Sequence, residues 1–167
     1  FEIYVNNAEL GGHLWDELFD KGEDLNVGPG CPNLIERIES GLLSFGGDMG
    51  YDTTPFECGL GQYVNLEANI ESLSIETLRI HKPKTKLIGL VIEKKVNLTE
   101  MLVFSGNRVL GKITSNVWSP KYSVHLAFAK CDVKLLEGRQ EKFVKTFCGE
   151  EAVQITNLPF DFPSLGL

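Results

Sequence analysis

The chain has 167 residues, enough for one ordinary domain or two small ones with hydrophobic cores. A hydrophobic content of 43% and a charged content of 23% are typical of globular proteins and exclude a disordered chain. The net charge of −7 and the absence of a lysine and arginine cluster argue against nucleic acid or an anionic membrane as a partner. No apolar run approaches the length of a membrane span, and we expect a cytoplasmic location.

The first residues alternate between apolar and polar side chains. This alternation predicts a strand over residues 1–5 that places Glu2 and Tyr4 on one face. Large apolar residues then recur at helical spacing over residues 10–19, which predicts a helix with Gly22 as its C-terminal cap. Because the sequence starts inside a predicted strand and without Met, we interpret it as a fragment or a cleaved piece.

A second helix is predicted to begin after Asn33. Its apolar stripe consists of Leu34, Ile35, Ile38, Leu42 and Leu43. Asn33 is the predicted N-cap, and Glu36 stands where the carboxylate of a capping box would reach back. Gly41 allows this helix to end. A glycine turn follows at residues 46–47, and then a short extended segment is predicted over residues 56–60.

The hydrophobic period changes from helix to strand after a polar, proline-broken stretch at residues 81–86. Strands are predicted over residues 86–96, 101–104, 108–113, 122–129, 143–148 and 152–156. Turns at residues 105–107 and 149–151 join two pairs of these strands into hairpins. Several short strands at this spacing indicate a small β-barrel or sandwich.

Four short motifs in this chain occur together in one known family. They are Glu36-Arg37-Ile38-Glu39-Ser40-Gly41, Gly46 to Asp48, Thr54-Pro55-Phe56-Glu57, and Gly111 with Thr114-Ser115 and Ser119-Pro120. Together they resemble the glycine-cleavage T-protein (aminomethyltransferase) family of folate-dependent one-carbon enzymes. The sequence of residues 28–44 is most similar to the dimethylsulfoniopropionate demethylase branch. Asn33 stands where the glycine-cleavage branch usually carries an arginine.

The resemblance implies an α+β fold, in which the rest of a ferredoxin-like α/β domain is followed by a small antiparallel β-barrel domain. Residues 1–80 would be the C-terminal remainder of the folate-binding domains, and residues 81–167 the barrel. The chain would then be the C-terminal half of the enzyme, with the N-terminal half as its partner. The acidic catalytic residue of the family would lie upstream, so we expect no catalytic residue in this fragment and no activity from it alone. A homodimer is left open.

The activity that the resemblance implies is a tetrahydrofolate-dependent methyl transfer. Dimethylsulfoniopropionate, a small sulfonium substrate, would be demethylated to methylmercaptopropionate, and 5-methyltetrahydrofolate would form. Two alternatives stay open: aminomethyl transfer in the glycine cleavage system, and a non-catalytic folate-binding module.

Two residues near the start are the predicted folate ligands. A pterin ring presents an N–H and an amino group side by side, and one carboxylate can accept both. The resemblance implies that Glu2 makes that contact. Without the resemblance, Glu2 would be interpreted as a solvent-exposed residue of a strand. Tyr4 could stack on a pterin or face a cationic substrate, and an exposed strand tyrosine is an equal alternative.

Other polar positions have structural explanations beside the functional ones. Trp118 and Arg37 could line a pocket. For Trp118 the alternative is a place in the hydrophobic core, where tryptophan is common. For Arg37, as for Glu39 and Glu57, the alternative is an ion pair between the helix and the next segment. We expect no metal site, because the cysteines are far apart in the sequence and form no C-x-x-C pair: Cys31, Cys58, Cys131 and Cys148.

Overall fold

The computed structural model describes residues 2–30, 33–68 and 71–167. The chain forms two compact units, Phe1–Pro32 and Asn33–Leu167. The domain boundary expected near residue 80 stays a prediction. Among the helices of the described residues, none combines the length and the apolar character needed to cross a membrane.

The first unit contains the predicted helix, α1 (Leu10–Gly22), which continues into a short 3-10 turn, η1 (Glu23–Leu25). Gly22 was expected to cap α1, and this prediction is wrong. The residue with left-handed backbone after the helix is Asn26, at φ 55°. Gly22 is required for another reason: a Cβ there would lie 2.6 Å from Cγ2 of Val27, which packs against the end of the helix.

The strand predicted at the N-terminus is not formed in the described residues. Phe1 lies outside them, and residues 2–5 are neither helix nor strand. Alternation makes a segment suitable for a sheet, but a strand exists only where its N–H and C=O groups pair with a neighbour. None of the described residues pairs with this segment.

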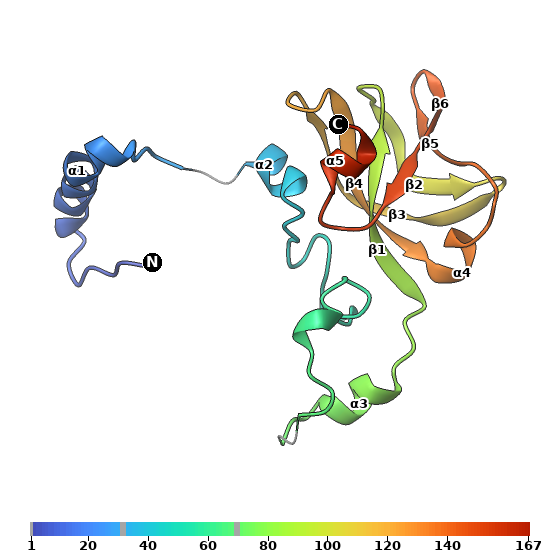
Figure 1. The fold of residues 1–167 in the computed structure, drawn as a ribbon, viewed down its shortest axis with the longest axis horizontal. Helices are drawn as coiled ribbons and strands as arrows, with labels where there is room; N and C mark the ends of the chain where they lie inside the picture. The colour runs from blue at the N-terminus through green and yellow to red at the C-terminus, as the bar shows by residue number, and fades with distance from the viewer. Residues whose placement is uncertain (1, 31–32, 69–70) are drawn as a thin grey trace. The chain divides into compact units, whose positions relative to one another are not determined.

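The second unit is built on an antiparallel sheet (Figure 1). Its strands in the described part of the chain are β1 (Thr85–Ile92), β2 (Leu98–Ser105), β3 (Arg108–Ser119), β4 (Val124–Asp132), β5 (Lys142–Thr146), β6 (Gly149–Ala152) and β7 (Gln154–Thr156). They lie in the order β6-β5-β2-β3-β4-β1-β7. The predicted β2–β3 hairpin is confirmed, with Ser105 opposite Arg108 across the turn.

The sheet curls because its two edge strands are almost continuous in sequence. β6 forms one edge and β7 the other, and only Val153 separates them. Two residue steps span at most about 7 Å, so the edges must come close together. The predicted antiparallel barrel is therefore confirmed as a curled antiparallel sheet. The ferredoxin-like part stays a prediction.

The hairpin expected over residues 143–156 is wrong in its turn and in its second strand. β5 pairs with β6, and the turn between them lies at residues 147–148 rather than 149–151. Gln154 to Thr156 pair instead with β1 on the opposite edge. Local turn signals predicted the hairpin, but the pairing of β7 is set by a strand more than sixty residues earlier.

Both faces of β1 and β4 are buried along most of their length, which explains the apolar run Leu87 to Ile92 in β1. The concave face carries one core cluster, with Leu90, Val103, Ile113 and Val144 among its most buried members. A second cluster lies on the opposite face of β1 and β4. There Ile38 and the C-terminal phenylalanines cover Leu87, Val91, Val124, Leu126 and Phe128.

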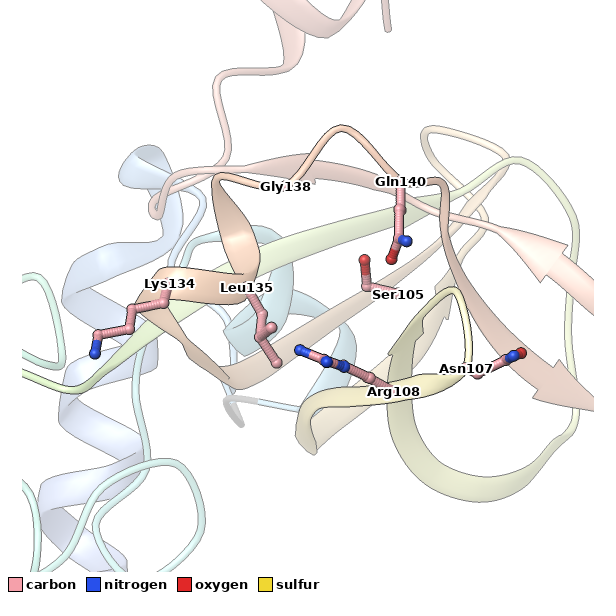
Figure 2. A pocket seen from close by; sticks show the side chains of 7 residues that line it. All are labelled: Ser105, Asn107, Arg108, Lys134, Leu135, Gly138 and Gln140. Carbon is pink, nitrogen blue, oxygen red and sulfur yellow. The ribbon is translucent and has the colours of Figure 1, made fainter.

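The described part of the second unit also contains short helices: α2 (Leu34–Glu39), η2 (Gly61–Tyr63), α3 (Ile75–Ile80), α4 (Val133–Leu136) and α5 (Phe162–Leu165). Ile38 of α2 and Phe162 of α5 belong to the second core cluster. Leu135 of α4 packs against the concave core and lines a hollow beside the β2–β3 turn (Figure 2).

The ends of α2 follow the sequence prediction. The N–H of Glu36 donates to Oδ1 of Asn33 at 2.9 Å, which confirms Asn33 as the N-cap. At the other end Gly41 is left-handed, at φ 71°. The N–H of Leu42 reaches the carbonyl of Arg37 at 2.9 Å, and the N–H of Gly41 reaches that of Ile38 at 3.0 Å. These two bonds form a Schellman motif, which ends the helix sharply.

The extended segment predicted over residues 56–60 is a run of turns instead. The N–H of Leu60 donates to the carbonyl of Pro55 at 2.8 Å, and Gly59 is left-handed, at φ 74°. The side chain of Glu57 turns back to the N–H of Thr54 at 3.0 Å. These local bonds replace the ladder that a strand would need.

Gly111 is the glycine whose loss should damage the fold most directly. A Cβ there would lie 2.3 Å from the carbonyl oxygen of Lys130 on the neighbouring strand, and backbone cannot move away cheaply. We predict that Gly111→Ala lowers the free energy of unfolding by about 2 kcal/mol or more, measured by urea denaturation. Gly11→Ala is the control, since nothing lies within 4 Å of its Cβ and alanine favours a helix. Equal stability of the two variants would contradict the packing described.

Candidate functional site

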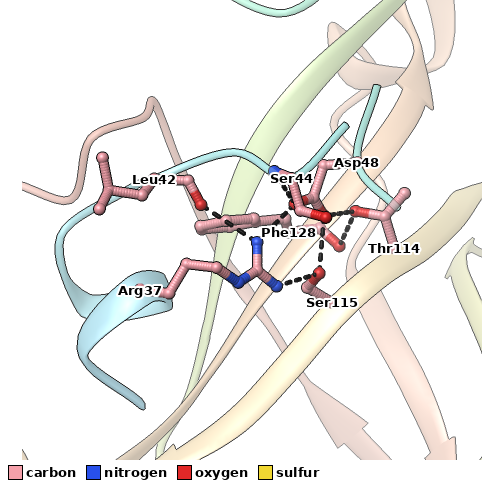
Figure 3. A network of polar contacts seen from close by, with 7 residues as sticks. All are labelled: Arg37, Leu42, Ser44, Asp48, Thr114, Ser115 and Phe128. Carbon is pink, nitrogen blue, oxygen red and sulfur yellow. Dashed lines mark hydrogen bonds and ion pairs between the residues drawn. The ribbon is translucent and has the colours of Figure 1, made fainter. Parts of the chain in front are cut away.

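A buried carboxylate lies at the centre of the polar contacts of the second unit (Figure 3). The side chain of Asp48 has no exposed surface. Its oxygens accept hydrogen bonds from Nη1 of Arg37 at 2.7 Å, the N–H of Ser44 at 2.9 Å, Oγ1 of Thr114 at 2.6 Å and Oγ of Ser115 at 2.7 Å. The carboxylate thus joins helix α2, the glycine turn and strand β3.

Arg37 reaches the same centre from α2. Besides Asp48, its guanidinium donates to the carbonyl of Leu42 at 3.1 Å and to Oγ of Ser115 at 2.7 Å. Its central carbon lies 5.8 Å from the centre of the Phe128 ring, within the range of a cation–π contact. The ion pair expected for Arg37 between the helix and the following segment is therefore present.

The environment of Asp48 favours its charged form. Burial alone would raise the pKa of this carboxyl, but the hydrogen bonds from Thr114, Ser115, Ser44 and Arg37 outweigh it and lower the pKa below its ordinary value. An ionised and fully bonded carboxylate with no exposed surface is suited to holding segments together. It is poorly suited to exchanging protons with a substrate.

Two further carboxylates of the motifs make the same kind of connection. Glu39 of α2 accepts a hydrogen bond of 2.6 Å from Oγ of the fully buried Ser119 in β3. Glu57 accepts one of 2.7 Å from Oγ1 of Thr85 at the start of β1. Its backbone carbonyl also accepts from the N–H of Leu87 at 2.7 Å. The motif residues thus bind the segment before the sheet to the sheet itself.

A cleft of about 570 Å³ lies between the glycine turn and the sheet. Lys112 and Lys130 stand opposite each other on β3 and β4 at its wall. Lys130 is 3.5 Å from Oδ2 of Asp52. Asp52 thereby offsets part of the repulsion between the two lysines.

The predicted folate ligands lie in the first unit and are in contact with each other. The hydroxyl of Tyr4 donates to Oε2 of Glu2 at 2.6 Å. Both side chains are exposed, and 83% of Tyr4 is accessible. The hydrogen bond with Glu2 raises the pKa of Tyr4. Their role as ligands stays a prediction.

The predicted pocket residues of the second unit differ in their surroundings. Arg37 belongs to the Asp48 network, whereas Trp118 is half-buried on β3 and lies outside both core clusters. Two residues before Trp118, Oδ1 of Asn116 accepts a hydrogen bond of 2.9 Å from Nε2 of His125. Nε2 of His81 lies 3.9 Å from Oε2 of Glu57.

The motifs are recognisable in the sequence, but the bonds that connect them are not. The sequence indicates a glycine turn at Asp48 and a family signature at Thr114 and Ser115, without indicating that these residues meet. The usable signal was the position of two hydroxyl residues in the middle of an otherwise apolar strand, where a buried partner is needed. The identity of that partner is not visible in the sequence.

The described residues contain no cluster of three or more His, Cys, Asp or Glu side chains able to hold a metal ion. Cys58, Cys131 and Cys148 are free thiols, and Cys31 lies outside the described residues. Burial raises the pKa of Cys131 to about 12, so its reactive thiolate form is suppressed.

Comparison with known proteins agrees with the motifs and the fold. Residues 1–68 match the family model described as the GCVT N-terminal domain. The crystal structure of glycine cleavage system aminomethyltransferase T from Bartonella henselae superposes with a TM-score of 0.62 at 22% identity, over 75% of this chain and 37% of that one. These matches confirm the resemblance to the glycine-cleavage T-protein family.

Among curated relatives, dimethylsulfoniopropionate demethylase from Ruegeria pomeroyi is 41% identical over 135 residues, which are 79% of this chain and 37% of the demethylase. An aminomethyltransferase from Bacillus mycoides is 32% identical and covers 80% of this chain and 38% of its own length. One from Synechococcus is also 32% identical, over 77% of this chain and 36% of its own. The chain therefore spans less than two fifths of the length of these relatives.

The Asp48 network supplies a stability prediction. Asp48→Asn keeps the shape but removes the charge that Arg37 and the hydroxyls bind, and we expect the free energy of unfolding to fall by about 3 kcal/mol. Asp52→Asn is the control, because Asp52 is exposed and its loss should change stability little. Urea denaturation measures both.

Acid titration gives a second readout of the same variant. Above about pH 5 the carboxyl is ionised in the folded and the unfolded chain, and its contribution is complete. Because its pKa is lowered in the folded state, that contribution is lost as the pH falls through the folded pKa. Asp48→Asn should therefore lose less stability in acid than the parent. If the free energy of unfolding fell equally steeply with pH in both proteins, the lowered pKa of Asp48 would be contradicted.

Proposed function

We propose that this chain is part of a tetrahydrofolate-dependent methyltransferase that demethylates dimethylsulfoniopropionate. The products are methylmercaptopropionate and 5-methyltetrahydrofolate. The observation that carries the proposal is the 41% identity to a dimethylsulfoniopropionate demethylase, against 32% for the aminomethyltransferases compared. Asn33 supports it, because a neutral helix cap stands where the aminomethyl-transfer branch usually carries an arginine.

The chemistry asks mainly for positioning. A sulfonium is an activated methyl donor: its C–S bond breaks, the electron pair stays on sulfur, and the N5 lone pair of tetrahydrofolate forms the new bond to carbon. The N5 proton is then released. An enzyme accelerates such a transfer by holding donor and acceptor in line and by excluding water.

Glu2 and Tyr4 have the features that a pterin site needs. A carboxylate can accept about four hydrogen bonds. Among the described residues, the side chain that donates to the Glu2 carboxylate is Tyr4. The remaining sites are free to accept the adjacent N–H and amino groups of the ring. The exposed Tyr4 ring can stack on the pterin or face the sulfonium, and its bond to Glu2 orients both side chains.

The rest of the active site belongs, in this proposal, to the N-terminal half of the same enzyme. The chain spans 37% of the demethylase's length, and none of the residues proposed as ligands is an acid placed at the reacting nitrogen. This chain alone should then be inactive. A cytoplasmic location is part of the proposal.

A second function in the same family is aminomethyl transfer from a lipoyl carrier protein, which gives methylenetetrahydrofolate and ammonia. The aminomethyltransferases among the relatives favour it. A non-catalytic folate-binding module is the third reading. The three differ in product, so one assay separates them.

The test uses the full-length protein with tetrahydrofolate, offered dimethylsulfoniopropionate in one reaction and an aminomethyl-loaded carrier protein in another. We expect 5-methyltetrahydrofolate and methylmercaptopropionate from the sulfonium, and no ammonia from the carrier. Ammonia release with the carrier alone would replace this proposal by aminomethyl transfer. Folate binding without either product would favour the binding module.

Glu2→Gln tests the ligand assignment in the same assay. The amide keeps the size of the side chain but loses the charge that strengthens both hydrogen bonds to the pterin, so KM for tetrahydrofolate should rise at least about tenfold. Glu9→Gln is the matched control, since Glu9 is an exposed acid of the same unit with no side-chain cap bond. An unchanged KM in Glu2→Gln would remove Glu2 from the site.

A further inference from the structure

A hollow of about 400 Å³ lies at one end of the curled sheet (Figure 2), and no residue of the family motifs lines it. It is lined by the β2–β3 turn, α4 and the loop before β5: Ser105, Asn107, Arg108, Lys134, Leu135, Gly138 and Gln140. The ends of β-barrels are common places for small ligands. None of these residues takes part in the function proposed above.

Ser105 forms the polar floor of the hollow. It follows the fully buried Val103 by two positions, so alternation turns its side chain to the concave face. Only 4% of Ser105 is exposed, and the residue lines the hollow. A serine hydroxyl can both donate and accept, so it can bond to a ligand or to water there.

Arg108 supplies the charge. It pairs with Ser105 across the turn and precedes the buried Leu110 by two positions, so it too belongs to the concave face. Its side chain extends toward Leu135, whereas those of Lys134 and Asn107 extend away (Figure 2). Within the described chain the Arg108 guanidinium makes no ion pair.

Gln140 completes the polar side of the hollow. Its amide points toward Ser105 in Figure 2. Oε1 of Gln140 would lie 2.8 Å from a Cβ at position 106, so the amide packs directly on Gly106 of the turn. The side chain is thereby held against the turn, with an N–H group available as a further donor.

This set of groups selects one class of ligand. A guanidinium fork, a hydroxyl and an amide are hydrogen-bond donors, and the positive charge disfavours a cation. The planar fork of arginine matches a carboxylate. Leu135 is half-buried against the core and offers an apolar wall. We propose that this hollow binds a small aliphatic carboxylate, with its oxygens on Arg108 and Ser105 and its chain against Leu135.

The test is an NMR titration of the full-length protein at constant ionic strength with butyrate, with neutral butyramide and with inorganic phosphate. Saturable shifts of the Gly106 and Gly138 amides are expected with butyrate and not with butyramide. Tighter binding of phosphate than of butyrate would overturn the assignment to carboxylates. The absence of saturation with butyrate would overturn the site.

Two variants locate the binding. Arg108→Gln should weaken butyrate binding at least about tenfold, because a charge-assisted bond is lost. Arg139→Gln is the control: it removes an exposed cation from the same loop that does not line the hollow. Arg108 is exposed, so the urea midpoint should not move. Equal weakening in both variants would indicate general attraction by charge and would contradict the proposal.

Discussion

The buried carboxylate of Asp48 is the constraint on which the second unit depends. A charge without exposed surface is tolerated only when it is paired and hydrogen-bonded. Here Arg37 brings the pairing charge from α2, while Thr114 and Ser115 bring hydroxyls from β3. Satisfying this one group therefore fixes where the helix, the glycine turn and the strand meet. The same arrangement keeps Asp48 ionised and shields its carboxylate from proton exchange with solvent.

The residues that make the family recognisable are, on this account, mostly structural. Glu39 accepts a hydrogen bond from Ser119, and Glu57 accepts one from Thr85. Both bonds connect the segment before the sheet to a strand, as the bonds of Asp48 do. The proposed ligands Glu2 and Tyr4 lie in the other unit, exposed and bonded to each other. The residues of the family signature and those of the proposed binding site are thus different sets. Changes in the signature should first affect stability, and changes at Glu2 should first affect the affinity for folate.

Features with a local cause could be predicted from the sequence. Asn33 caps α2 through a bond three residues away, Gly41 ends it, and the β2–β3 turn closes within four residues. Features with a distant cause could not. β7 pairs with β1 across more than sixty residues, and Asp48 bonds Thr114 at a separation of 66. The strand expected over residues 1–5 depends on a partner that the described residues do not supply.

A double-mutant cycle of Asp48→Ala and Thr114→Val measures whether Asp48 bonds β3 to the segment before it. Oγ1 of Thr114 donates to Oδ1 of Asp48 at 2.6 Å, and Asp48→Ala removes this acceptor. We expect a coupling free energy of about 1–2 kcal/mol from urea denaturation of the four proteins. Effects that add to within about 0.3 kcal/mol would contradict it.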